Sequence, residues 1–223
     1  MNFDKKYREW QDWPECITST SDISINSKKV SFYREKDSHK GISEFKLIKK
    51  LLAKQVNQEF LNEISKLESL EYLEIEILTA EDLTPLTNLK KLRTLKLEGI
   101  RKANEFSFLE KMESLTKLFI ENAKNISNLS FLSKAHNLVA IGLEGGMYTK
   151  QKIDSLEPIS CLNKLEALFM SSVQLKDKNL DYLATIPNLK YLGAARFAPK
   201  SSFESLRKNM PKLSCNWCDN YDV

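Results

Sequence analysis

Two cysteines near the end of the sequence have a spacing that can do chemistry. Cys215 and Cys218 are separated by two residues, which is the spacing of half a zinc site or of a redox-active dithiol. The other two cysteines do not form a second such pair, and His39 and His136 lie in unrelated segments. We therefore interpret Cys215 and Cys218 as free thiols and predict neither a metal site nor a cofactor.

The motifs of common catalytic sites are missing from the sequence. It has no glycine-rich phosphate loop, no G-x-S-x-G nucleophile turn and no H-E-x-x-H metal motif. The pair Gly145-Gly146 lacks the strand–loop–helix context of a phosphate loop, and we interpret it as a turn. We predict no catalytic residues and do not expect an enzyme.

A row of carboxylates has a regular spacing along the chain. The four glutamates follow one another at intervals of 22 or 23 residues, and each comes directly after an alternating apolar segment: Glu76, Glu98, Glu121 and Glu144. If those segments are neighbouring parallel strands, the four carboxylates stack about 4.8 Å apart. Like charges so close together repel, so the row favours a role in binding a basic protein partner over a role in stability.

The apolar segments belong to an internal repeat. The pattern leucine-x-x-leucine-x-leucine, with some substitutions, occurs in six clear copies that begin 22 to 27 residues apart: at Leu70, Leu92, Leu115, Leu138, Leu165 and Leu189. Every interval falls within the 20 to 29 residues of leucine-rich repeats. A degenerate first copy is predicted at Ile42-Ser-Glu-Phe45-Lys-Leu47.

These copies resemble a known family. The segments DLTPLTNLKKLRTLKL (82–97) and SLEPISCLNKLEAL (155–168) resemble the short repeats of bacterial internalins and of phosphatase regulatory subunits. The resemblance covers roughly residues 42–217 and implies an α/β solenoid: a leucine-rich repeat arc with a concave parallel β-sheet, convex short helices and 3₁₀ turns, and an N-terminal cap. Many such families have an Asn three residues after the last apolar position, and this chain has no Asn ladder there.

Three regions are predicted along the chain. Residues 1–40 form a non-repeat cap with a hairpin around the turn at 27–29, and Trp10 and Trp13 either plug this cap or extend a binding surface. Residues 41–212 hold the repeats. Residues 213–223 form a closing strand and tail, and a strand there would put Cys215 and Cys218 on opposite sides.

The outward strand positions predict the binding site. They combine the glutamates with aromatic side chains and glycines, which suits a partner presenting Lys or Arg around an apolar knob. A longer interval inserts residues 147–152 at one rim, where a binding residue is also predicted. The candidate partner-binding residues are Glu74, Glu76, Glu98, Phe119, Glu121, Glu144, Tyr148, Phe169 and Tyr191.

Composition narrows the function classes. The 223 residues carry a net charge of +4 and are 42% hydrophobic. No apolar run is long enough to span a membrane, and we expect no secretory leader. The mild, scattered charge argues against a nucleic-acid binder.

We predict a cytoplasmic protein-binding module, monomeric before its partner binds. The most concrete form is an inhibitor, similar to ribonuclease inhibitors, or a bacterial immunity protein that neutralises a basic, nuclease-like toxin. The alternative is a regulatory or scaffold subunit that targets a host enzyme such as a phosphatase.

Overall fold

The computed structural model describes residues 2–222, in two compact units. Unit 1 comprises Met1–Glu9 and Thr116–Val223, and unit 2 comprises Trp10–Leu115. The N-terminal nine residues therefore belong to the same unit as the C-terminal half of the sequence.

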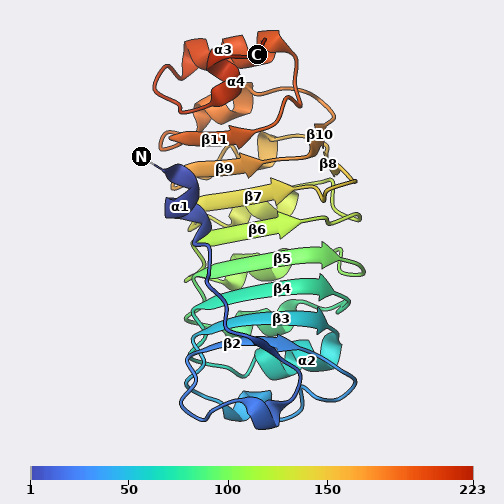
Figure 1. Ribbon diagram of the computed structural model, residues 1–223. Helices are drawn as coiled ribbons and strands as arrows, with labels where there is room; N and C mark the ends of the chain where they lie inside the picture. Colours follow the sequence, from blue (N-terminus) through green and yellow to red (C-terminus); the bar gives the residue numbers. More distant parts are fainter. Residues whose placement is uncertain (1, 223) are drawn as a thin grey trace. The chain divides into compact units, whose positions relative to one another are not determined.

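Unit 2 is a stack of parallel strands (Figure 1). Each strand pairs with the next in chain order: β1 (Cys16–Ile17), β2 (Lys29–Tyr33), β3 (Lys50–Val56), β4 (Tyr72–Leu78) and β5 (Thr94–Ile100). The returns between them are short: helix α2 (Gln58–Ile64) and 3₁₀ turns at Thr20–Asp22, Ile42–Glu44, Thr84–Asn88 and Ser107–Lys111.

Unit 1 repeats the same plan. Its strands β6 (Lys117–Glu121), β7 (Ala140–Glu144), β9 (Ala167–Met170) and β11 (Tyr191–Ala194) are parallel neighbours in that order. A second, two-stranded sheet pairs β8 (Gln151–Ile153) with β10 (Val173–Leu175). The helices and 3₁₀ turns are α1 (Phe3–Arg8), Ser130–Lys134, Glu157–Ile159, Asp181–Thr185, α3 (Lys200–Asn209) and α4 (Asn216–Asp219).

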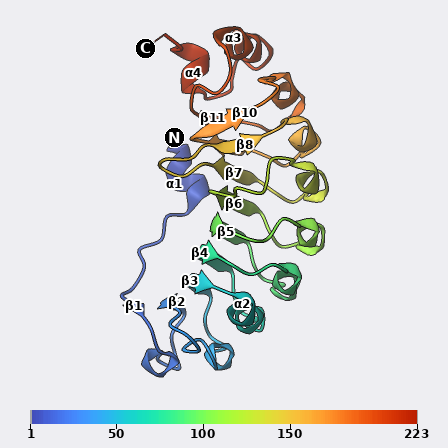
Figure 2. The same ribbon diagram turned by 90° about the vertical axis from the view of Figure 1, so that its right-hand side faces the viewer.

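The leucine pattern produces this architecture because its apolar positions align between neighbouring strands. Leu73 lies in register with Leu95, and Leu118 with Ile141 and Leu168, and all five are buried. One repeat cannot cover its own apolar row, so stacking is what creates the core. In each unit the strands lie on one side of that core and the 3₁₀ turns and short helices of the repeats on the other (Figure 2).

Left-handed backbone occurs near the carboxyl ends of several strands. The glutamate row and the equivalent positions of the neighbouring strands are each followed by one residue whose φ is positive, between 52° and 64°. These residues are Gln55, Ile77, Gly99, Asn122 and Ser172. Gln55 and Ile77 are skipped in the pairing of β3 with β4, and Ile77 and Gly99 in the pairing of β4 with β5, so the ladder is interrupted at these three residues. Only one of the five is glycine, although this conformation favours glycine.

Glutamine side chains replace the missing Asn ladder at two repeats. The buried amide of Gln151 accepts from the backbone N–H of Ala123 at 2.9 Å and donates to the carbonyls of Ala123 and Ile126. The Gln58 amide bonds the backbone of residues 81 and 82 in the same way. At both turns a residue from a neighbouring repeat pairs the backbone groups. At Ala123 these groups are buried, where such pairing is required.

Three sequence predictions about the ends are wrong. The hairpin in residues 1–40 does not form, because β2 pairs in parallel with β1 and β3. The first repeat does not lie at 42–47, where the structure has a 3₁₀ turn. Its strand is β3, in which Leu51 aligns with Leu73, so this copy begins at Ile48. The alternation of apolar residues predicted β2 correctly, but the residues directly before the turn at 27–29 form no strand, and the pattern could not show which partners β2 would choose.

The predicted closing strand is also wrong. It is reduced to a single parallel bridge between Ser214 and Tyr191. Helix α4 begins directly afterwards, with Cys215 at its N-cap.

Candidate functional site

The outward side chains of unit 1 form an aromatic face. We use this name for Phe119 on β6, Glu144 on β7, Phe169 on β9 and Tyr191 on β11. Phe119 and Phe169 flank Gly142 in the strand register, and their ring centroids lie 5.9 Å apart. A Cβ added at Gly142 would lie 2.4 Å from the Phe119 ring. Glycine is therefore required there for the two rings to pack together.

Helix α1 covers this aromatic face (Figure 1). The Phe3 ring stacks on Tyr191 with centroids 4.9 Å apart and 12° between the planes. The Arg8 guanidinium lies 4.3 Å from the centroid of Phe169. As a result Phe169 is only 1% exposed and Phe119 only 6%, although both are outward strand positions.

A bidentate ion pair holds the C-terminal end of α1. Arg8 Nη1 and Nη2 donate to the two carboxylate oxygens of Glu144 at 2.5 and 2.7 Å, and Ser171 Oγ donates to the same carboxylate. Burial lowers the pKa of Arg8, but the hydrogen bonds and charge of Glu144 outweigh it and the pKa is raised. This planar, bidentate geometry is the strong form of an ion pair.

A second anchor lies one residue earlier. The buried Tyr7 hydroxyl donates to Glu166, which also accepts from Lys190 at 2.9 Å and Lys6 at 3.4 Å. The Tyr7 hydroxyl, followed by Lys190, lowers the pKa of Glu166 to about 2. Lys117 Nζ donates to Glu9 at 2.6 Å. The end of α1 is thus held by charges of both signs.

The structure brings together four of the predicted site residues and covers them with α1. Phe119, Glu144, Phe169 and Tyr191 are neighbours, as the register predicts, but the chain's own N-terminus covers them. Glu121 lies beside Glu144 and is half-buried. Sequence reasoning missed the α1 residues that cover the face. Their signal was present in Asn2-Phe-Asp-Lys-Lys-Tyr-Arg8, a capping residue followed by two aromatics one helical turn apart.

Unit 2 holds the open part of the predicted row. We call Glu74, Glu76 and Glu98 the acidic strip. Glu76 pairs with Lys54 at 2.8 Å, and Glu74 with Lys96 at 3.9 Å. Glu98 is exposed and forms no ion pair with any described residue. Desolvation, followed by the charges of Glu76 and Glu74, raises its pKa. The charge of Lys54 offsets part of this shift, and a further cation arriving at Glu98 would offset more of it.

Both N-terminal tryptophans lie near this strip. Trp10 is 65% exposed, and the Lys96 ammonium lies 4.7 Å from its ring centroid. Trp13 packs at a tilt against Tyr72 with centroids 5.7 Å apart. Aromatic side chains such as this exposed indole are enriched at protein interfaces.

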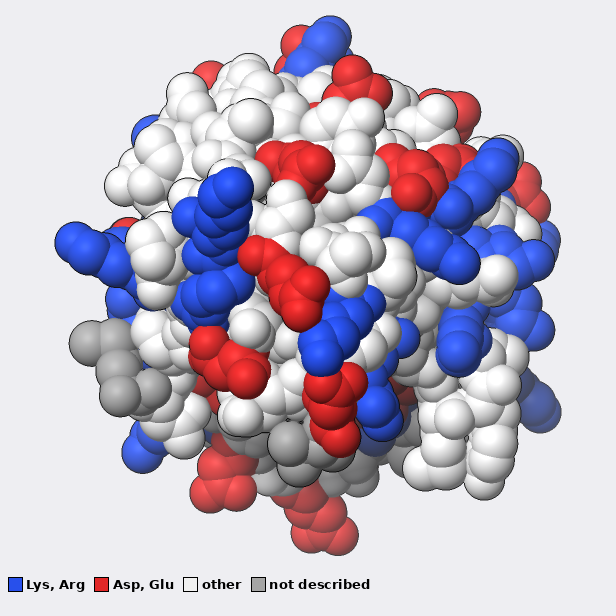
Figure 3. Space-filling model, turned by 90° about the horizontal axis from the view of Figure 1, so that it is seen from above, with Lys and Arg blue, Asp and Glu red and all other residues white. Residues whose placement is uncertain are grey.

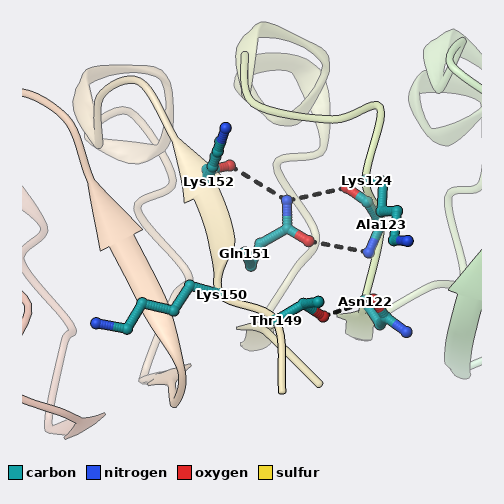
Figure 4. A pocket seen from close by; sticks show the side chains of 7 residues that line it. All are labelled: Asn122, Ala123, Lys124, Thr149, Lys150, Gln151 and Lys152. Atoms are coloured by element: carbon teal, nitrogen blue, oxygen red, sulfur yellow. Dashed lines mark hydrogen bonds between the residues drawn. The ribbon is translucent and has the colours of Figure 1, made fainter. Parts of the chain in front are cut away.

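The inserted loop projects from unit 1. Tyr148 is 93% exposed and Met147 87%. Beside the loop lies a pocket of about 290 Å³ lined by residues 122–124 and 149–152. Figure 4 shows the Gln151 amide bonded inside it, while the side chains of Lys150 and Lys152 extend away from each other. These ammonium groups do not converge on one ligand.

The paired cysteines lie in a setting different from the one predicted. Cys215 is buried at the start of α4 and Cys218 lies within that helix, instead of facing opposite sides of a strand. A hydrogen bond with Cys218 lowers the pKa of Cys215 to about 7 and raises that of Cys218. Among the described residues no group of three or more potential ligands gathers for a metal.

Surface charge at the α3 end of unit 1 is mixed (Figure 3). Basic and acidic side chains alternate there, and two pairs, Lys200 with Asp222 and Arg207 with Asp219, are ion pairs. No helix in the described part of the chain is long and apolar enough to cross a membrane.

Comparisons with known proteins identify the fold. No protein-family model and no curated protein matches the sequence. Internalin F of Listeria monocytogenes is 16% identical, with 88% of this chain and 71% of that chain covered and a TM-score of 0.57. Internalin C2 of the same species is 19% identical over 70% of this chain and 67% of that chain, at 0.52. A chain of the Drosophila Toll–Spatzle complex is 12% identical over 72% of this chain and 22% of its own length, at 0.53.

The structure and these similarities agree on one class. The protein has the leucine-rich repeat fold, an α/β solenoid with parallel strands on one side and short helices and 3₁₀ turns on the other. At these identities the similarity is one of fold, and function has to be argued from the faces themselves.

Proposed function

We propose that this chain is a non-catalytic protein-binding module whose acidic strip binds a basic protein. The observation that carries the proposal is Glu98, an exposed carboxylate without an ion-pair partner among the described residues, beside two further glutamates. Stability alone does not favour two carboxylates, Glu76 and Glu98, in register on neighbouring strands. A Lys or Arg from a partner would supply the missing charge, and the exposed Trp10 would add apolar contact area.

The finer form of the proposal is an inhibitor or immunity-type protein. A basic, nuclease-like toxin or enzyme presents cationic side chains around its active site to hold phosphates, and the acidic strip has the complementary charge. The neighbouring proteins support binding in a general way, because one of them was solved in the Toll–Spatzle complex. Sequestration of the toxin in the cytoplasm follows from this proposal.

Affinity capture with a charge-reversed bait tests the proposal. The bait carries Glu74→Lys, Glu76→Lys and Glu98→Lys, and lysates come from the source organism and its competitors. We expect wild type to retain a basic protein that the variant loses, with retention falling as salt rises. An endogenous enzyme retained through the same strip would instead favour the regulatory-subunit alternative.

A matched control separates the strip from net charge. Glu44, Glu68 and Glu105 are exposed residues of unit 2 outside the strip, and changing these three to Lys alters the net charge by the same amount. We expect this control to behave as wild type. Equal retention by wild type and the strip variant would contradict the proposal.

A further inference from the structure

The aromatic face of unit 1 is covered by the chain's own helix α1. The aromatic face has the chemistry predicted for a partner site, an apolar patch beside a carboxylate. Helix α1 supplies the complementary groups, aromatic rings and a guanidinium. Phe3 and Tyr7 lie one helical turn apart and Arg8 follows directly, so one side of a short helix presents two rings and a guanidinium.

Helix α1 has the properties of a docked ligand. It has six residues, far below the roughly 12 to 15 at which an isolated helix becomes stable in water. Its helical form therefore depends on the contacts it makes. Those contacts pair it with β7, β9 and β11, more than 130 residues away in sequence, through Glu144, Phe169 and Tyr191.

The face that α1 leaves behind would be ready for another helix. Glu144 is 6% exposed while Arg8 covers it, and Phe169 is 1% exposed. When α1 leaves, the face regains a bare carboxylate and two packed rings. Gly142 lets the two rings stay packed, since a Cβ there would collide with Phe119.

We propose that the aromatic face of unit 1 binds a short helix of a protein partner that carries two aromatic side chains one turn apart followed by an arginine, and that α1 occupies this site until the partner displaces it. The occupant seen on the face defines this chemistry. The proposal is independent of the acidic strip, which belongs to unit 2, so either can fail alone.

A peptide-binding experiment with the full chain tests the proposal. The probe is a fluorescent peptide of residues 2–10, NFDKKYREW, capped at both ends, and the readout is anisotropy. In wild type the tethered α1 competes at an effective concentration on the order of millimolar. We expect an Arg8→Glu protein, whose own α1 is released, to bind the peptide at least tenfold more tightly than wild type.

Two variants provide controls. Lys5→Glu makes the same charge change at an exposed residue of α1 and should bind the peptide as weakly as wild type. In the Arg8→Glu protein, a further Glu144→Lys change should restore docking of the chain's own α1 through the reversed ion pair, so binding of this peptide should fall back to the wild-type level or below. Such a charge swap distinguishes a specific site from general exposure of apolar surface.

Amide hydrogen exchange gives a second readout. We expect residues 3–9 of wild type to exchange at least a hundredfold faster than β7, and addition of the peptide to speed this exchange further. If the Arg8→Glu protein folds but does not bind the peptide, or if α1 is as protected as β7, then α1 is a fixed cap and the proposal is wrong.

Discussion

Removing one hydroxyl from α1 tests how the helix is held. Tyr7→Phe keeps the buried ring but deletes the donor to Glu166. The folded structure lowers the pKa of Glu166 from 4.5 to about 2. At about 1.4 kcal/mol per pKa unit this amounts to about 3.5 kcal/mol for all the partners of Glu166 together. Solvent screening of the partly exposed carboxylate reduces this to about 2 kcal/mol. Tyr7 is the largest contributor, so we expect the variant to lose about 1 kcal/mol at pH 7.

The pH dependence of that loss follows from the sign of the shift. Because the folded state lowers the pKa of Glu166, its contribution is present above about 4.5 and is lost as the pH falls towards 2. The difference between Tyr7→Phe and wild type should therefore shrink between pH 5 and pH 2.

Urea unfolding at pH 7, 5 and 2 measures both effects. Tyr33→Phe is a suitable control, because Tyr33 is an exposed tyrosine of unit 2, and it should be neutral within about 0.5 kcal/mol. The reasoning is refuted if Tyr7→Phe is as stable as wild type at pH 7, or if its deficit is unchanged at pH 2.

Three further predictions concern stability. Phe169→Ala should cost about 3 to 5 kcal/mol in a thermal melt, because the ring is buried under α1; a loss below 1 kcal/mol would contradict that burial. Gly99→Ala should cost about 1 kcal/mol in urea, because φ is +64° while the new Cβ meets only ordinary contacts; no loss would show that the turn relaxes. Burial, followed by the charge of Arg34, lowers the pKa of His39. The free energy of unfolding of wild type should therefore fall as the pH drops below about 6.5, and that of His39→Phe should fall less. Equal losses between about pH 7.5 and 5 would refute this.

The repeat was predictable because its signal is local and periodic. Each copy places apolar residues at fixed offsets, and stacking is the single arrangement that buries them all. The alignment of Glu76 with Glu98, and of Glu121 with Glu144, followed from the same offsets. Exposure of Tyr148 followed from its place in an insertion.

Partner choice was less predictable because it depends on distant residues. Alternation around the turn at 27–29 favoured a hairpin, but β2 instead pairs with β3, which continues the parallel stack. The end of the chain could continue as a strand or turn into a helix, and after Ser214 it forms α4. Local sequence supported both outcomes in each case.

The sequence by itself determined the solenoid, the strand register and the rows of outward side chains, because periodic burial specifies them repeat by repeat. Only the tertiary structure decided which of those side chains meet solvent. Glu98 remains open, whereas Glu144 and Phe169 are covered by six residues from the start of the chain. The physical reason is that α1 is too short to form on its own, and its docking depends on contacts between residues far apart in sequence, which no local pattern encodes.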